Sequence, residues 1–306
     1  MKTAWIFPGQ ASQKVGMGKD LYENSEIGKN YYKIANEILE TDIQSISFNG
    51  PEDQLNKTKY TQPAIYIVST IIGHIMIENG FAPDGVAGHS LGEYSAIVAA
   101  GGITFEVGLE LVKLRSQSMH RAGKINPGTM AVIIGMTADR VEKLCNSNDN
   151  KNVIVAANYN TESQIVVSGD IDSVKKLIIK AKEHGARMAV PLNVSGAFHS
   201  QLMKPAREEL ADKLDSIEIS DINIPLYSNV DAKPIKKGKD IKDSLVRQLE
   251  NPVLWFETIK NMTIDSYSSY IEIGPGKVLQ GLNQKIDRTL SNSGIQSHED
   301  IITYEI

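Results

Sequence analysis

Short apolar runs alternate along the chain with longer apolar stripes of helical period, and this alternation indicates an α/β protein. Apolar runs predict strands at residues 3–7, 81–87, 224–230 and 270–273. Apolar positions at helical spacing predict helices at residues 31–39, 62–72, 93–100, 105–122 and 201–214, and one that ends near 249. We therefore expect a mostly parallel sheet covered by helices.

Proline and glycine residues indicate where two helices begin. Pro63 stands near the start of the 62–72 helix, where a missing N–H costs least, and this helix is apolar enough to be central and buried. The turn Gly274-Pro275-Gly276 follows the strand at 270–273 and opens what we expect to be the final helix.

The pattern changes after Asn126-Pro127-Gly128. Strands are expected at residues 129–135, 153–158, 163–168 and 186–192, with helices at 138–145 and 171–184. The order βαββαβ is that of the ferredoxin-like unit. We expect this unit at residues 127–194, as an insertion into a larger domain made of residues 1–126 and 195–306.

Composition and charge exclude several protein classes. The 306 residues are 41% hydrophobic and 23% charged, as in globular proteins, and the net charge of −5 argues against nucleic acid as the main partner. The only cysteine is Cys145, so neither a disulfide nor a cysteine metal site is expected within a monomer. The apolar run at the N-terminus is too short for us to expect a signal peptide, and no apolar run is long enough to span a membrane, so we expect a cytoplasmic protein.

The pentapeptide Gly88-His89-Ser90-Leu91-Gly92 lies between a predicted strand and a predicted helix. That is the context of a nucleophile elbow, in which the two glycines permit a sharp turn and close packing of helix on strand. Ser90 is then a nucleophile, and the Leu91 amide points to where an oxyanion would form. The alternative is a glycine-bounded turn in which Ser90 is a helix N-cap.

Arg115 falls on the apolar stripe of the 105–122 helix, three residues after Val112 and four before Met119. A buried arginine must find an anion, because an unpaired buried charge is very costly. The spacing alone leaves three explanations open: a structural ion pair, a side chain that snorkels to water, or a clamp for a substrate carboxylate.

His199 lies at a predicted helix start, behind the small-residue loop Asn193-Val194-Ser195-Gly196-Ala197. A lone histidine there is more often a cap or a surface residue. A nucleophilic Ser90 needs a base, however, and few other histidines have comparable loop positions. The loop at 8–18 follows the first strand but lacks both phosphate-binding spacings, so by itself it is a plain connection.

The chain resembles the malonyl-CoA:acyl carrier protein transacylases from end to end. The matching stretches are Phe7-Pro8-Gly9-Gln10, Thr61-Gln62-Pro63-Ala64, Gly88-His89-Ser90-Leu91-Gly92-Glu93-Tyr94, Arg115 with Met119, Val194-Ser195-Gly196-Ala197-Phe198-His199-Ser200, Gln248-Leu249 with Asn251-Pro252-Val253, and Glu272-Ile273-Gly274-Pro275-Gly276. Several motifs in the right order are far more specific than any one of them.

The resemblance implies an α/β-hydrolase-like core that carries a ferredoxin-like subdomain. It also implies that Ser90 accepts the acyl group, that His199 is its general base, and that the backbone carbonyl of Gln248 orients the imidazole. The backbone amides of Gln10 and Leu91 are implied as the oxyanion hole.

The resemblance further implies substrate-binding residues: Arg115 for the malonyl carboxylate, Met119, Asn158 near the acyl-binding cleft, and Phe198, which favours a small malonyl unit. Ala11 is a departure, because many relatives have glycine there. If this position requires a positive φ, alanine costs about 1 kcal/mol and shifts the preceding amide.

The implied reaction moves a malonyl group from malonyl-CoA to the phosphopantetheine thiol of an acyl carrier protein, through a malonyl-serine. It belongs to fatty acid or polyketide synthesis and needs no metal or other cofactor. We expect a monomer, with activity falling below about pH 6.5, where an ordinary histidine becomes protonated.

Two other functions compete with this one. A serine thioesterase or esterase of the α/β-hydrolase type would share the elbow but has its histidine close to the C-terminus, whereas more than a hundred residues follow His199. A noncatalytic module that docks carrier proteins would have an unreactive Ser90.

Overall fold

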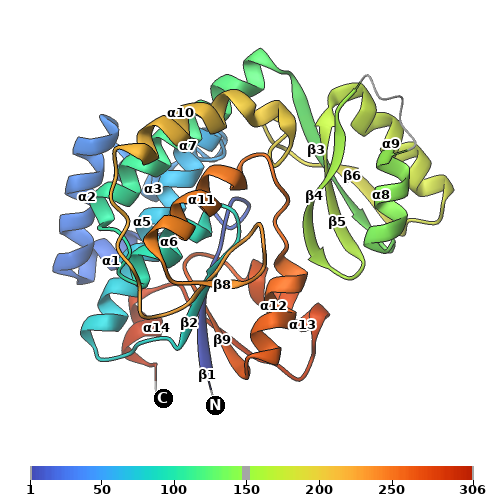
Figure 1. Cartoon of the computed structure of the whole chain (residues 1–306). Coiled ribbons are helices and arrows are strands. Elements are labelled where there is room, and N and C mark those ends of the chain that lie inside the picture. Colours follow the sequence, from blue (N-terminus) through green and yellow to red (C-terminus); the bar gives the residue numbers. More distant parts are fainter. Residues whose placement is uncertain (1, 147–151, 305–306) are drawn as a thin grey trace.

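The computed structural model describes residues 2–146 and 152–304. A six-stranded sheet in the order β10-β9-β1-β2-β7-β8 forms the centre of the larger part of the molecule (Figure 1). Its strands are β1 (Lys2–Phe7), β2 (Gly85–Gly88), β7 (Leu226–Tyr227), β8 (Pro234–Ile235), β9 (Tyr267–Ile273) and β10 (Ser291–Ile295). All its strand pairs are parallel except β7 with β8. The predicted mostly parallel α/β sheet is confirmed.

Helices cover both faces of this sheet because its central strands are apolar on both sides. Along β1, Trp5 and Phe7 face one core, and Ala4 and Ile6 face the other. The helices of this part are α1 (Lys19–Asn24), α2 (Glu26–Leu39), α3 (Ile43–Asn49), α4 (Glu52–Leu55), α5 (Thr58–Glu78), α6 (Gly92–Ala99), α7 (Phe105–Ile125), α10 (Lys204–Asp215), α11 (Gly238–Gln248), α12 (Trp255–Ile264), α13 (Val278–Ile286) and α14 (His298–Ile302). A short 3₁₀ turn, Gln201–Met203, precedes α10.

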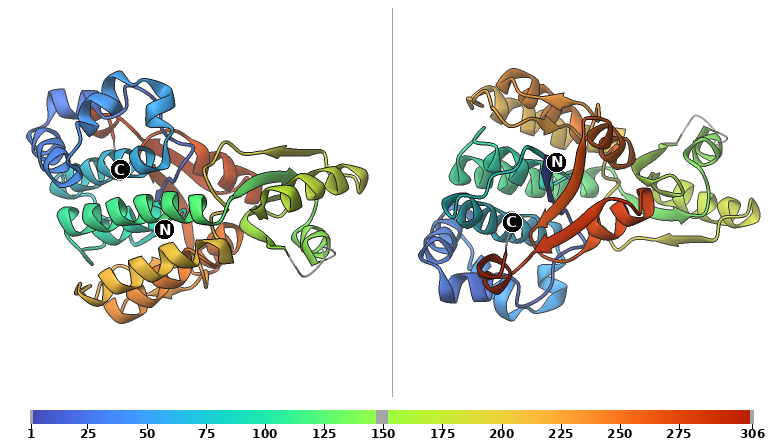
Figure 2. Two further views of the ribbon diagram at one scale, coloured as in Figure 1. Left: turned by 90° about the horizontal axis from the view of Figure 1, so that it is seen from above. Right: turned by 90° about the horizontal axis from the view of Figure 1, so that it is seen from below.

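The smaller part is an antiparallel sheet in the order β4-β5-β3-β6, with a hydrophobic core of its own. Its elements are β3 (Gly128–Ile134), α8 (Ala138–Asn146), β4 (Ile154–Thr161), β5 (Gln164–Asp170), α9 (Ile171–Glu183) and β6 (Met188–Pro191). This is the strand and helix order expected from the sequence. Figure 2 shows that this part projects from one end of the larger part.

A parallel bridge joins the two parts. The Tyr159 amide donates to the Val253 carbonyl (2.9 Å), and the Val253 amide donates to the Ala157 carbonyl (2.9 Å). Strand β4 of the smaller part is thereby held against the segment that follows α11. The site described below is built at this junction.

Several predicted element boundaries are wrong. Helix α5 begins at Thr58, so Pro63 lies inside it; the polar residues of its first turn concealed the start. The run at 81–87 is a strand only from Gly85, and the run at 224–230 pairs only at Leu226–Tyr227, because the chain then turns toward the Ser90 loop. The helix after Gly276 is not the last element, since β10 and α14 follow it. The polar edge strand β10 gives no apolar signal.

Candidate active site

Ser90 lies on a sharp turn between β2 and α6, with a φ of 52°. A Cβ on Gly88 would lie 2.0 Å from the carbonyl carbon of Gly92, and one on Gly92 would lie 2.0 Å from the carbonyl oxygen of Phe7. Both positions therefore require glycine. The N-cap of α6 is Leu91, and no side chain caps this helix, so the alternative of Ser90 as an N-cap is wrong.

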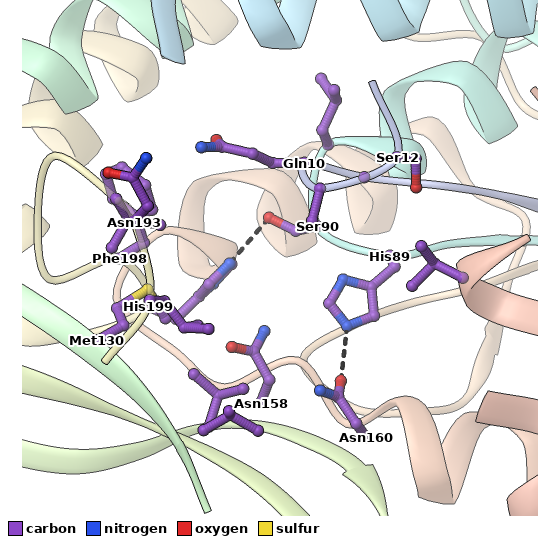
Figure 3. A pocket seen from close by; sticks show the side chains of 18 of the residues that line it. Gln10, Ser12, His89, Ser90, Met130, Asn158, Asn160, Asn193, Phe198 and His199 are labelled. Carbon is purple, nitrogen blue, oxygen red and sulfur yellow. Dashed lines mark hydrogen bonds between the residues drawn. The ribbon is translucent and has the colours of Figure 1, made fainter. Parts of the chain in front are cut away.

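His199 approaches Ser90 from a chain segment 109 residues further on. Its Nε2 lies 2.8 Å from Ser90 Oγ (Figure 3). Its Nδ1 lies 2.9 Å from the Gln248 carbonyl oxygen and 3.2 Å from that of Asn251. Carbonyl oxygens only accept, so Nδ1 carries the proton and Nε2 is free to accept one from the serine hydroxyl.

His199 is almost fully buried, and burial is the main cause that lowers its pKa, to about 3, with the positive charge of Arg115 as the second cause. The carbonyls of Gln248 and Asn251 act in the opposite direction. The imidazole is consequently neutral at physiological pH, the form that can act as a base.

The Arg115 side chain, from α7, is completely buried beside Ser90. Its guanidinium donates to Ser90 Oγ (2.9 Å), to Gln62 Oε1 (2.8 Å) and to Gln248 Oε1 (2.9 Å). No carboxylate of the described residues lies within ion-pair distance, and Arg115 Nε has no acceptor among them. The structural ion pair and the snorkelling side chain are both wrong, and the charge is available to an anionic ligand.

The backbone amides of Gln10 and Leu91 have no acceptor among residues 2–146 and 152–304, and both residues line the same cavity as Ser90. The Gln10 loop packs on the elbow at Gly9, where a Cβ would lie 2.5 Å from the His89 carbonyl oxygen. Two free N–H groups on either side of a serine suit a developing oxyanion.

Ala11 has a φ of 88°, so the position where many relatives have glycine does require a positive φ. Ala11→Gly should raise the free energy of unfolding by about 0.5–1 kcal/mol, since relief of the left-handed strain exceeds the entropy that glycine adds to the unfolded chain. Chemical denaturation measures this change, and Gly185→Ala, at a φ of 89° with open space around it, is the reverse control and should destabilise. A destabilised Ala11→Gly variant would contradict the strain.

A cavity of about 650 Å³ opens in front of these groups, between the two parts of the molecule. Met119, Asn158 and Phe198 all line it. Figure 3 shows Asn158 beside Asn160 on β4, where Asn160 Oδ1 lies 2.9 Å from His89 Nε2. All the candidate residues named from the sequence therefore line this cavity except Gln248. Gln248 lies behind the cavity wall and contacts His199 through its carbonyl and Arg115 through its side chain.

Comparison with known proteins places this site in a family. A family model described as "Acyl transferase domain" matches residues 4–304. The chain belongs to the acyl transferase family. A malonyl CoA-acyl carrier protein transacylase of Bacillus subtilis is 42% identical over 98% of this chain and 95% of its own. One of Synechocystis is 41% identical over 96% of this chain and 97% of its own.

Solved structures agree with this family membership. An acyl carrier protein S-malonyltransferase from Vibrio cholerae superposes with a TM-score of 0.95 at 39% identity, over 100% of both chains. A malonyl-transacylase solved in complex with a type II PKS acyl carrier protein superposes with a TM-score of 0.95 at 38% identity, over 99% of this chain and 98% of that one.

Sequence reasoning overlooked four polar residues that support the site of this acyl transferase. Gln62 contacts Arg115, and its Nε2 lies 3.5 Å from Met119 Sδ. Asn229 accepts from the Ser90 amide (2.7 Å) and donates to the Gly88 carbonyl, which secures the elbow. Asn160 holds His89, and Glu93 is buried next to Gln248. Gln62 and Glu93 lie within the family motifs quoted above, which could have marked them as site residues. Asn160 and Asn229 lie outside these motifs.

Two further observations concern metal-binding clusters and membrane-spanning helices. In the two described ranges, no group of three or more His, Cys, Asp or Glu side chains is placed to hold a metal ion. None of the helices described is long and apolar enough to cross a membrane.

Proposed function

We propose that this acyl transferase moves a malonyl group from malonyl-CoA to the phosphopantetheine thiol of an acyl carrier protein, through a malonyl-serine at Ser90. The single observation that supports it best is the completely buried Arg115, whose charge has no carboxylate partner among the described residues and which lies 2.9 Å from the nucleophile oxygen. A guanidinium binds a carboxylate in a bidentate fork, and malonyl carries a carboxylate two bonds from the reacting carbonyl.

In the first half-reaction, Ser90 Oγ transfers its proton to His199 Nε2 and attacks the thioester carbonyl. The tetrahedral oxyanion accepts hydrogen bonds from the Gln10 and Leu91 amides. The C–S bond then breaks, and the proton on His199 passes to the sulfur of the departing coenzyme A. An oxyanion donor contributes about 10²–10³-fold and a general base about 10²–10⁴-fold to such a step.

The second half-reaction runs through the same groups in reverse. The carrier thiol gives its proton to His199 and attacks the acyl-serine, and Ser90 leaves with that proton. One thioester replaces another, so the exchange by itself calls for no metal or redox cofactor. We propose a monomer as the working unit, because the fold of a single chain already brings Ser90, His199 and Arg115 within hydrogen-bond distance of one another.

Water in place of the carrier thiol would make the protein a thioesterase. The relatives named malonyl transacylases support transfer over hydrolysis, and Arg115, which has no carboxylate partner among the described residues, supports a dicarboxylic acyl group over a neutral ester. The relative solved with an acyl carrier protein supports the same acceptor here.

The two structural parts support a division into domains. We propose a catalytic domain of α/β-hydrolase type at residues 1–126 and 195–306, and a ferredoxin-like subdomain at 127–194. The strand order β4-β5-β3-β6 and the separate core of the smaller part support this division. Asn158 and Phe198, one from each domain, then face the acyl group across the cavity.

Intact-mass spectrometry tests the proposal. Wild-type protein mixed with malonyl-CoA should gain one malonyl group, and holo acyl carrier protein should then remove it and carry the same mass increase. An adduct that water clears before the carrier can take it would favour the thioesterase. No adduct at all would favour a noncatalytic docking module.

The pKa of His199 changes the expected pH dependence. Acyl-serine formation from acetyl-CoA, which adds no carboxylate, should stay level from pH 8 to pH 5, because the pKa of about 3 keeps the imidazole neutral. This differs from the loss below about pH 6.5 expected from the sequence, because burial lowers the pKa of His199. Stopped-flow experiments measure the rate of acyl-serine formation at each pH, and a rate that halves near pH 6.5 would contradict a buried neutral His199.

The same pKa affects stability. An unfolded histidine has a pKa of about 6.5 and takes up a proton that folded His199 does not, so stability decreases as pH falls from 6.5 toward 3. His199→Ala should remove this pH dependence, so that the free energy of unfolding falls less steeply between pH 6.5 and pH 3.

A further inference from the structure

Gln248 connects all the reactive groups of the site. Its backbone carbonyl accepts from His199, its side-chain oxygen accepts from Arg115 (2.9 Å), and its side-chain nitrogen donates to the Ser90 carbonyl (2.9 Å) and to Glu93 Oε2. The residue is completely buried. A primary amide can be turned end for end with almost no change in shape, so something must determine which end faces Arg115.

Glu93 provides that determinant together with the Ser90 carbonyl, because both accept from the Gln248 nitrogen. It is completely buried on the first turn of α6, and its other oxygen accepts from the Asn229 amide (3.3 Å) and the Ser244 hydroxyl (3.4 Å). An ionised carboxylate only accepts hydrogen bonds, so the amide NH₂ must face it. The amide oxygen is then directed to the guanidinium, which only donates.

We propose that Glu93 is a positioning residue which, through the side-chain amide of Gln248, aligns the Arg115 guanidinium for the substrate carboxylate. The backbone N–H of Glu93 donates to the Ser90 carbonyl (3.2 Å), but among the described residues its carboxylate is linked to Arg115 only through the Gln248 amide. It also places a negative charge on the far side of the amide from Arg115, which offsets part of the buried positive charge before substrate enters. This inference rests on the proposed malonyl transfer.

The protonation of Glu93 fits this role. Burial raises the pKa of Glu93 to about 7, against the hydrogen bonds from Gln248, Asn229 and Ser244, which lower it. The carboxyl is therefore ionised at pH 8, where the test is made.

The test uses Glu93→Gln, which keeps the shape and burial but can donate as well as accept. The neutral amide can present its own NH₂ group to Gln248 Nε2, which leaves only the Ser90 carbonyl to hold that nitrogen, and the negative charge behind Arg115 is lost. At pH 8 we expect the KM for malonyl-CoA to rise at least tenfold, with kcat changed less than threefold and acetyl-CoA kinetics unchanged. An equal loss with both esters would overturn the relay.

Glu272→Gln is the matched control. Glu272 is also completely buried, but its carboxylate accepts from the amides of Leu279 and Gln280 at the start of α13 and has no link to Arg115. It should leave the malonyl-to-acetyl preference unchanged, and a shift as large as that of Glu93→Gln would overturn the assignment. Wild-type protein is assayed with both esters in parallel. If wild type transfers no malonyl group, the proposed function fails, and this outcome is distinct from a failure of the Glu93 relay.

A second variant covers the case in which Glu93→Gln does not fold. Gln248→Met keeps the length of the side chain and the backbone carbonyl that holds His199, but removes both ends of the amide. It should lose malonyl preference in the same way. An unchanged preference in this variant would show that Arg115 needs no alignment by the amide, and would overturn the proposal.

Discussion

Ser90→Ala is expected to form no acyl-enzyme and to lose about 10⁵–10⁶-fold in transfer rate, since it removes the oxygen that forms the ester. Intact mass after mixing with malonyl-CoA measures the adduct, and a radiolabel assay measures the residual transfer. The fold should survive, because the sharp turn is held by Gly88, Gly92 and Asn229 rather than by the hydroxyl.

His199→Ala and the double variant complete this experiment. The two side chains form one unit through their 2.8 Å contact, so the double variant should be scarcely worse than Ser90→Ala alone. Losses that add in free energy would mean that the two residues act independently, and a normal adduct on Ser90→Ala would place the nucleophile elsewhere.

Arg115→Ala is expected to lower kcat/KM for malonyl-CoA by about 10²–10³-fold while acetyl transfer changes little. Truncating one partner of a buried charge pair costs about 3–5 kcal/mol, and only the malonyl group supplies the other partner. Parallel assays with the two CoA esters measure the difference, and thermal unfolding verifies that the variant is folded.

Arg121→Ala is a matched control on the same helix. Arg121 is half-exposed and pairs with Glu209 at the surface, so its loss should affect neither ester. If Arg115→Ala slowed both esters equally, the arginine would serve Ser90 or the fold rather than the carboxylate.

The sequence predicted the elbow and the sheet well because both depend on neighbours along the chain. Gly88 and Gly92 flank Ser90 at the spacing that a tight strand-to-helix turn requires, and β1 and β2 are apolar on both faces. Prediction failed where the local signal was polar. The polar strand β10 and the polar first turn of α5 carry no apolar pattern, and β7 is cut short by contacts that Asn229 makes with the elbow.

The candidate residues could be named from the sequence, but their chemistry could not be decided there. Spacing left Arg115 with three explanations, because a stripe position does not reveal which groups from other elements face it. The structure excludes two of them, since neutral oxygen partners exclude the structural ion pair and complete burial excludes the snorkelling chain.

The sequence by itself determined the local geometry of the nucleophile, the strand and helix order of the smaller part, the mostly parallel α/β character of the larger part, and the motifs that mark the family. Tertiary structure alone decided the rest. It brought His199 to Ser90 across 109 residues, buried the imidazole so that its pKa falls to about 3, and connected Glu93 to Arg115 through the Gln248 amide. The physical reason is that hydrogen bonding and burial between distant segments depend on which elements pack together. Apolar periodicity marks the face of an element that is buried but not the groups that it meets.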